Sequence, residues 1–344
     1  MNTSVRSQAA GFSMIELVIA SSLLGLMIMA VSTLAVSGGE AQEFSKRLGR
    51  ATEVTQDIVD QMRLEMVSCV RVFGNDTEGN ANRALIDLTD APVPLSTARL
   101  PSVSPNQRLQ KDTVALEITG NSLFFTRLAW SDRFVCASGK EYLVDVYRWV
   151  YYYLTPVDGG PQPDNGIGLN LVRVLSEPLV DAAGIDRITD ATDQAEVLLH
   201  LATGTADING VTHPRATVVW VRGGLPATTG TLRQIDLDDG TLSDDPIDGR
   251  PDPWQILRST DEVDELLTYR HHSVGTNYAR ASFGVGRYGL VSNVGEGFPH
   301  GLEVQIVGPS SARQVMLHLV VIGTQLRGQQ AWADVQVSVD ARDL

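Results

Sequence analysis

The sequence predicts an α+β fold, in which one long N-terminal helix packs on a mainly antiparallel β-sheet domain. Apolar residues recur with helical spacing across residues 12–70. Beyond residue 73 the pattern changes to the two-residue alternation that is typical of strands. The composition, with 43% hydrophobic and 20% charged residues, is that of a globular chain rather than a disordered or polytopic one.

The apolar segment at residues 17–36 is the first part of the predicted helix. It contains 20 residues without a charge, which corresponds to about 30 Å of helix and suffices to cross a membrane. A secretory signal places its small residues after the apolar stretch, whereas Ala9, Ala10 and Gly11 precede this one. Glu16 lies at its start, where a carboxylate is costly in lipid and requires a partner.

Residues 39–72 are predicted to continue the helix as an amphipathic segment. Its apolar stripe is expected to lie on the sheet, with charged residues, Glu65 among them, between the apolar positions. The stripe consists of Phe44, Leu48, Ala51, Thr55, Ile58, Met62, Met66 and Cys69.

Residues 73–344 are predicted to form the β-rich domain. The expected strands are rich in β-branched and aromatic residues and are bounded by Gly, Pro or Asp. They fall at residues 113–118, 122–128, 142–154, 169–175, 217–222, 303–307, 314–322 and 334–339.

Residues 11–16 (GFSMIE), followed by the apolar run, resemble the processing signal of type IV prepilins and type II secretion pseudopilins. The resemblance implies that a prepilin peptidase removes residues 1–11, cutting between Gly11 and Phe12, and methylates the new N-terminus of Phe12. Residues 12–38 would then form the transmembrane and filament-core helix. Glu16, the fifth mature residue, would pair with the amine of a neighbouring subunit during assembly.

A second resemblance concerns residues 146–154 (VYRWVYYYL) and 171–180, which are similar to a strand–loop–strand block of PilW-type minor pilins and J-type minor pseudopilins. It implies a minor pilin that initiates or caps a type IV pilus. Residues 181–300 fit the block poorly and are interpreted as an elaborated region. The alternatives are a minor pseudopilin of type II secretion, and a tip adhesin that binds a surface or ligand through the elaborated region.

The same resemblance implies the partners and the location of the chain. The partners would be other pilins or pseudopilins, the prepilin peptidase, the inner membrane and the pilus assembly platform. The chain would cross the bacterial inner membrane once, with its C-terminal domain in the periplasm, before it enters a pilus or pseudopilus. Arg6 in the leader agrees with a cytoplasmic N-terminus.

Several functional classes are disfavoured by the sequence. The formal net charge is −14 and there is no basic cluster, which argues against nucleic-acid binding. The GxGxxG match at residues 284–289 does not open a helical pattern, and His271 and His272 are adjacent and would point apart on a strand. The sequence therefore predicts a protein that is not an enzyme.

Two further sets of residues carry specific expectations. If the domain is exported, the even cysteine count favours a disulfide between Cys69 and Cys136. An Asp-rich loop offers carboxylates of the kind that bind Ca²⁺, although its glycine spacing departs from an EF-hand and a solvated acidic loop is the alternative. The candidate Ca²⁺ ligands are Asp236, Asp238, Asp239, Asp244 and Asp245. No other cofactor is expected.

Overall fold

The computed structural model describes only part of the chain. The described residues are 13–88, 91, 93–105, 118–155, 168–176, 179–203, 219–221, 232–235, 242–243, 247–255, 272–275, 301–323 and 331–343. The chain forms two compact units, Met1–Gly49 and Arg50–Leu344. The fold is α+β, with one long N-terminal helix and a mixed, largely antiparallel sheet.

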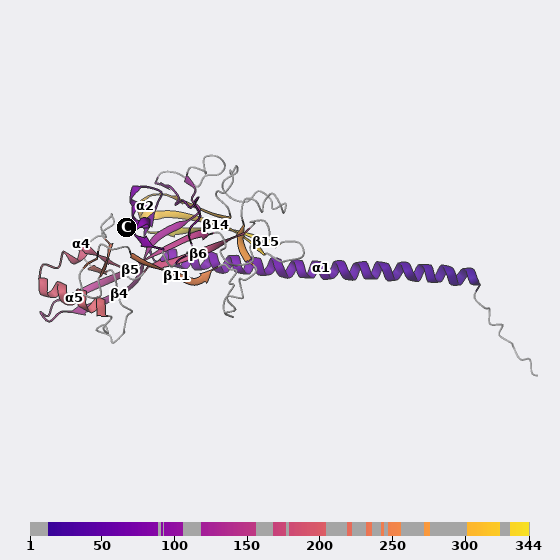
Figure 1. The fold of residues 1–344 in the computed structure, drawn as a ribbon, viewed down its shortest axis with the longest axis horizontal. Helices are drawn as coiled ribbons and strands as arrows, with labels where there is room; N and C mark the ends of the chain where they lie inside the picture. The colour runs from indigo at the N-terminus through magenta and orange to yellow at the C-terminus, as the bar shows by residue number, and fades with distance from the viewer. Residues whose placement is uncertain are drawn as a thin grey trace, which may run out of the picture. The chain divides into compact units, whose positions relative to one another are not determined.

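Helix α1, Met14–Val67, contributes to both units (Figure 1). Residues 14–46 of the helix are exposed along their whole length, whereas the part in the second unit buries one face. The helix ends at Val67, and the amide and the hydroxyl of the next residue, Ser68, both donate hydrogen bonds to the Glu65 carbonyl, at 3.2 and 2.9 Å. The buried residues of α1 are Ala51, Val54, Thr55, Ile58, Val59, Met62, Glu65 and Met66.

The centre of the second unit is a twelve-stranded sheet built around the hairpin of β4, Leu123–Val135, and β5, Glu141–Thr155. Gly139 adopts φ +80° in the turn of this hairpin, a conformation that favours glycine. Strand β1, Cys69–Phe73, pairs with β4, and β6, Gly168–Ser176, pairs with β5.

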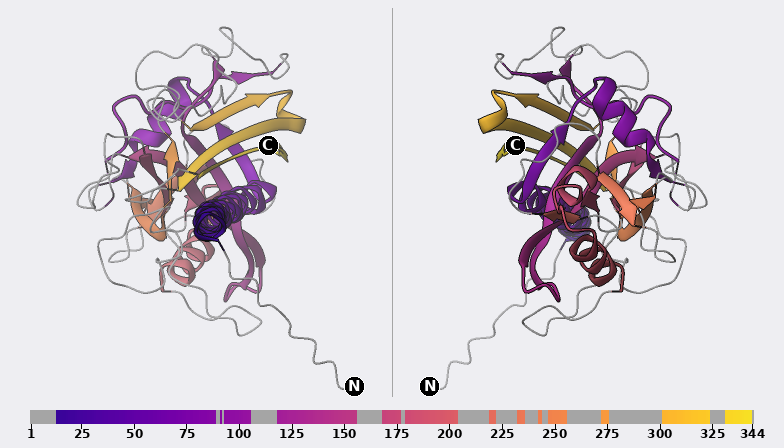
Figure 2. Two further views of the ribbon diagram at one scale, coloured as in Figure 1. Left: turned by 90° about the vertical axis from the view of Figure 1, so that its right-hand side faces the viewer. Right: turned by 90° about the vertical axis from the view of Figure 1, so that its left-hand side faces the viewer.

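The C-terminal strands continue the same sheet. Strand β14, Arg313–Gly323, pairs antiparallel with both β13, Leu302–Val307, and β15, Ala331–Ala341, and these three strands lie side by side (Figure 2). Strand β12, His272–Gly275, links β14 to β6. The described strand pairs are antiparallel except β2 with β11 and β3 with β13.

Shorter elements complete the described part of the second unit. The helical ones are α2, Thr77–Ala84, α4, Ala182–Ile185, α5, Ala191–Thr203, and the 3₁₀ turn Ser310–Ala312. The strands are β2, Ile86–Asp87, β3, Val103–Ser104, β7, Val180–Asp181, β8, Val219–Val221, β9, Leu232–Ile235, β10, Leu242–Ser243, and β11, Ile247–Gln255.

Both faces of the sheet are buried, so strand β5 is aromatic and apolar on both sides. Tyr152 and its alternate neighbours pack with α1 in one cluster. Trp149, Tyr151 and Tyr153 point the other way, into a cluster that includes Phe124 of β4 and residues of α4 and α5. This alternation explains why residues 149–154 read as a continuous apolar run, and it decides which tyrosine meets the helix.

Most of the strands predicted within the described residues are present, with longer bounds. The predicted strand at 122–128 extends to Val135, and the one at 142–154 begins at Glu141 and ends at Thr155. The predicted strand at 113–118 lies almost entirely outside the described residues. Within 181–300 the structure contains helices α4 and α5, which the sequence reading did not anticipate.

Candidate functional site

The first described residues form a reciprocal cap at the start of α1. Ser13 precedes the helix, and its backbone N–H donates to Glu16 Oε2 at 2.9 Å. The backbone N–H of Glu16 donates in return to Ser13 Oγ at 3.2 Å. This pair is a capping box, which satisfies two of the amides left open at a helix start. The predicted cleavage residues, Gly11 and Phe12, lie outside the described residues.

The capping role of Glu16 was missed in the sequence reading, although the signal was present. Ser13 followed three residues later by Glu16, just before an apolar run, is the pattern of a capping box. The cap orients the carboxylate but leaves its charge uncompensated, because Ser13 is neutral. Glu16 is exposed and forms no ion pair with another described residue.

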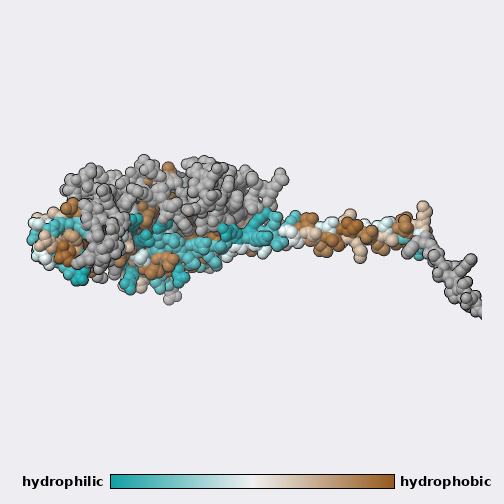
Figure 3. Space-filling model, turned by 90° about the horizontal axis from the view of Figure 1, so that it is seen from below, coloured by the Kyte–Doolittle hydropathy of each residue, from teal (hydrophilic) through white to brown (hydrophobic). Residues whose placement is uncertain are grey.

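The helix that follows Glu16 has the length and composition of a membrane span. Its most apolar 18-residue window has a mean hydropathy of 2.3 and contains no buried residue. Figure 3 shows the apolar side chains of this first unit in brown. Three of its hydroxyl groups bond within the helix, from Ser21 and Ser22 to the Val18 carbonyl and from Thr33 to the Met29 carbonyl. Such internal bonds are what a hydrocarbon environment requires of polar groups.

In the second unit, the same helix carries a buried carboxylate, Glu65, which is only 2% exposed. Arg173 of β6 contacts it with two nitrogens, Nη2 on Oε1 and Nε on Oε2, the latter at 3.2 Å. The Tyr152 hydroxyl of β5 donates to Oε2, and Arg127 Nη1 of β4 lies 3.3 Å from Oε1. Glu65 therefore binds α1 to three adjacent strands.

The strand register explains how these partners converge on Glu65. Tyr152 and Arg173 are directly opposite each other in the β5–β6 pair, and both side chains face the helix. Burial raises the pKa of Tyr152 and the adjacent Glu65 charge raises it further, so the phenol remains a proton donor. The sequence reading placed Glu65 among the charged residues between the apolar positions; in the structure it belongs to the buried face.

A second buried cluster of charges lies on the C-terminal strands. His318 of β14 is fully buried, and its Nδ1 lies 2.6 Å from Glu303 Oε2 while its Nε2 lies 2.8 Å from Asp334 Oδ1. Burial alone would lower the pKa of His318, but the hydrogen bonds to Asp334 and Glu303 outweigh it and raise the pKa to about 9. The imidazole is therefore a cation held between two carboxylates at neutral pH.

The predicted disulfide between Cys69 and Cys136 is not formed; both residues are buried free thiols. Cys69 lies opposite Arg127 of β4, and Cys136 follows nine residues further along the chain, so at about 3.3 Å per residue the two lie roughly 30 Å apart. A disulfide requires Cα atoms about 4.4–6.8 Å apart. The Cys69 thiol donates to the Arg71 carbonyl, and burial raises the pKa of Cys136 to about 11.

The remaining candidate residues lie outside the part of the chain that the structure describes. The proposed Ca²⁺ ligands Asp236, Asp238, Asp239, Asp244 and Asp245 lie outside the described residues, as do residues 284–289 and His271. Within the described ranges, no group of three or more His, Cys, Asp or Glu side chains is arranged to hold a metal ion.

Comparison of the chain with protein-family models, with curated proteins and with solved structures gave no match in any of the three.

Proposed function

We propose that this chain is a minor subunit of a type IV pilus-like filament, processed between Gly11 and Phe12 and methylated on Phe12. The observation that carries the proposal is the position of Glu16. Its carboxylate lies in the first turn of α1, at the start of the exposed apolar part of the helix and five residues after Gly11, and no described cation neutralises it.

The physical basis is the cost of that carboxylate in lipid. A charge placed there costs several kcal/mol unless a cation meets it. Cleavage after Gly11 would create a cation close to the same level of the membrane, the amine of Phe12. Pairing Glu16 of one subunit with the Phe12 amine of another relieves two charges with one contact and fixes the axial register between the subunits.

The large size of the chain favours a subunit that is present in few copies per filament. Removal of residues 1–11 would leave 344 − 11 = 333 residues, a large domain for a subunit repeated throughout a helical lattice. A subunit that initiates or caps the filament does not have to satisfy that repeat. The same pairing of Glu16 with a Phe12 amine would also operate in a type II secretion pseudopilus. Deletion of the chain distinguishes the two systems: it should abolish surface pili in the first case and protein export in the second.

Mass spectrometry of the intact chain from membranes, with and without a co-expressed prepilin peptidase, tests the proposal. The expected product begins at methylated Phe12 and is absent when the peptidase is absent. Gly11→Val should remain uncut, whereas Ala10→Val, a matched change at the adjacent leader residue, should still be processed. An unprocessed Met1 form in the presence of the peptidase, or cleavage after the apolar run near Val36, would contradict it.

A further inference from the structure

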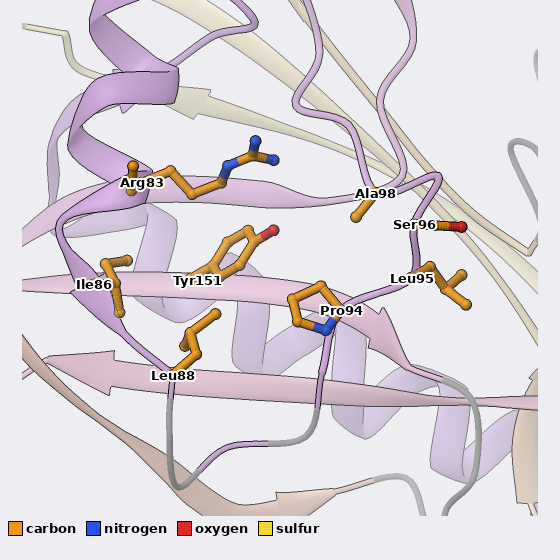
Figure 4. Close-up of a pocket in the computed structure, with 9 residues that line it drawn as sticks. Arg83, Ile86, Leu88, Pro94, Leu95, Ser96, Ala98 and Tyr151 are labelled. Carbon is orange, nitrogen blue, oxygen red and sulfur yellow. The ribbon is translucent and has the colours of Figure 1, made fainter.

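The second unit contains a cavity of about 370 Å³ on the face of β5 that points away from α1 (Figure 4). Cavities of this size accommodate small organic molecules. Its lining comes from the end of α2, from β2, from the segment at residues 94–98 and from β5. The lining residues are Arg83, Ala84, Ile86, Leu88, Pro94, Leu95, Ser96, Ala98 and Tyr151.

Two polar groups converge on this cavity from different elements. The guanidinium of Arg83 and the hydroxyl of Tyr151 point toward one another at one side, and Ile86, Leu88 and Pro94 line the opposite side (Figure 4). Tyr151 is 1% exposed, and burial raises its pKa, so its hydroxyl remains a protonated donor. Arginine presents its donors in a planar fork that matches the two oxygens of a carboxylate.

Helix α2, which carries Arg83, is held in place by contacts with β1 and with the segment that precedes the helix. Asp76 caps the helix by accepting a bond from the Gly79 amide at 2.7 Å, and Arg71 of β1 pairs with Glu78 at 2.9 Å. A side chain at Gly79 would meet the Gly74 carbonyl oxygen at 2.1 Å, so the helix approaches this loop as closely as glycine permits. These contacts hold the helix that presents the guanidinium.

The charge of the lining is opposite to that of the molecule as a whole. The nine lining residues that the structure describes include one arginine and no Asp or Glu, whereas the chain has a net charge of −14. A cationic group beside apolar walls favours an anion over a neutral molecule or a cation. Ile86, Leu88 and Pro94 add an apolar surface that a simple inorganic anion would leave unused.

We propose that this cavity binds a small amphiphilic carboxylate, whose carboxylate accepts hydrogen bonds from Arg83 and Tyr151 while its short apolar group packs against Ile86, Leu88 and Pro94. Two sources offer this chemistry, a free short-chain carboxylic acid and the terminal carboxylate of a polypeptide that ends in an aliphatic residue.

Equilibrium dialysis of radiolabelled hexanoate tests this site, with the full chain in phosphatidylcholine nanodiscs and empty nanodiscs subtracted. The expected result is saturable binding of one hexanoate per chain. Arg83→Gln should weaken it about tenfold or more, the scale of a lost charged hydrogen bond. Arg63→Gln, which removes an equal charge from an exposed position on α1, should leave it unchanged.

A second variant keeps the test valid if Arg83→Gln perturbs the fold, as a shifted melting curve would reveal. Ala98→Phe fills the cavity without touching the arginine and should also abolish binding. Saturable binding that survives in both variants, or hexanoate uptake that does not saturate, would overturn the proposal. The neutral analogue 1-hexanol should not compete with hexanoate, and effective competition by it would overturn the role of Arg83.

Competition separates the two sources. Displacement of hexanoate by N-acetyl-leucine but not by N-acetyl-leucinamide supports a polypeptide terminus as ligand. Failure of N-acetyl-leucine to compete, with hexanoate still bound in an Arg83-dependent manner, supports a free acid.

Discussion

Glu16 and Glu65 are two carboxylates on the same helix, and they differ in where their partners come from. Glu16 is exposed, and its described contacts are those of its own cap with Ser13. Glu65 is buried and is met by two arginines and a tyrosine from three strands. The charge of Glu65 is thus compensated within the fold, whereas the charge of Glu16 is not met by any cation among the described residues.

The apolar side chains of the two regions show the same difference. Leu24 in the first unit is 59% exposed, whereas Ile58 in the second unit is fully buried in the sheet's core. The second half of α1 therefore derives its stability from intramolecular packing. The first half has no core of its own, and its exposed apolar surface has the length and composition of a candidate membrane span. This contrast between the two halves of α1 supports the proposed filament role, and each of the following substitutions tests it.

The largest loss of unfolding free energy is expected for Glu65→Ala. The change leaves the buried Arg173 guanidinium without its carboxylate, which typically costs about 3–5 kcal/mol of unfolding free energy. Denaturant unfolding of the detergent-solubilised full chain, followed through tryptophan fluorescence, measures it. Glu53→Ala is the matched control, because Glu53 forms an exposed pair with Arg50 on the same helix and should cost less than about 1 kcal/mol. Equal losses in the two variants would show that Glu65 is not an anchor.

A pair of apolar truncations compares the two halves directly. Ile58→Ala should destabilise the second unit by about 2–5 kcal/mol, the usual cost of a cavity in a packed core. Leu24→Ala should leave that stability within about 0.5 kcal/mol, since the residue is exposed. The same unfolding measurement checks both, and a similar cost for Leu24→Ala would contradict the division between the halves.

The His318 cluster should make the stability of the second unit depend on pH. The folded pKa of about 9 is raised above the ordinary value of 6.5, so protonation stabilises the folded state fully below pH 6.5. That contribution, about 3 kcal/mol for 2.5 pKa units, is lost as pH rises through 9. Unfolding free energies between pH 6 and 10 should therefore fall more steeply for the unmodified chain than for His318→Gln. Parallel curves would show that the imidazole is neutral in the fold.

Labelling of the two free thiols tests the described strand arrangement of the second unit without any substitution. Cys69 and Cys136 are 2% and 3% exposed, so a maleimide reagent should label neither in the folded chain. After denaturation without a reductant, both should be labelled. Labelling that appears only after reduction would show that the two cysteines pair after all, which would require a different strand arrangement from the one described.

Sequence reasoning predicted the helix and the α+β class because periodicity is a local signal. It expected a helix over residues 12–70, and the structure has Met14–Val67. It could not assign Glu65 to the core, because that depends on the register that brings Tyr152, Arg173 and Arg127 together from distant positions. The cavity beside Arg83 was missed for the same reason, since its walls come from four elements.

The disulfide shows a different limit. An even number of cysteines in a chain that is expected to be exported favours pairing. Only the sheet reveals that Cys136, which directly follows β4, lies far from Cys69. The Ser13–Glu16 cap, by contrast, is a local pattern that the sequence itself contains. Glu16 can both cap the helix and pair with a neighbouring subunit, and substitutions can separate these two roles.

Filament incorporation of Glu16→Gln and Ser13→Ala tests the central claim most directly. Glutamine at the third helical position can complete a capping box, so Glu16→Gln keeps the cap and removes the charge. Ser13→Ala weakens the cap and keeps the charge. Each variant is first shown by mass spectrometry to be processed, and its amount in sheared filaments is then measured relative to that in membranes. We predict that Ser13→Ala enters filaments and that Glu16→Gln is excluded; entry of Glu16→Gln at the level of the unmodified chain would contradict the account.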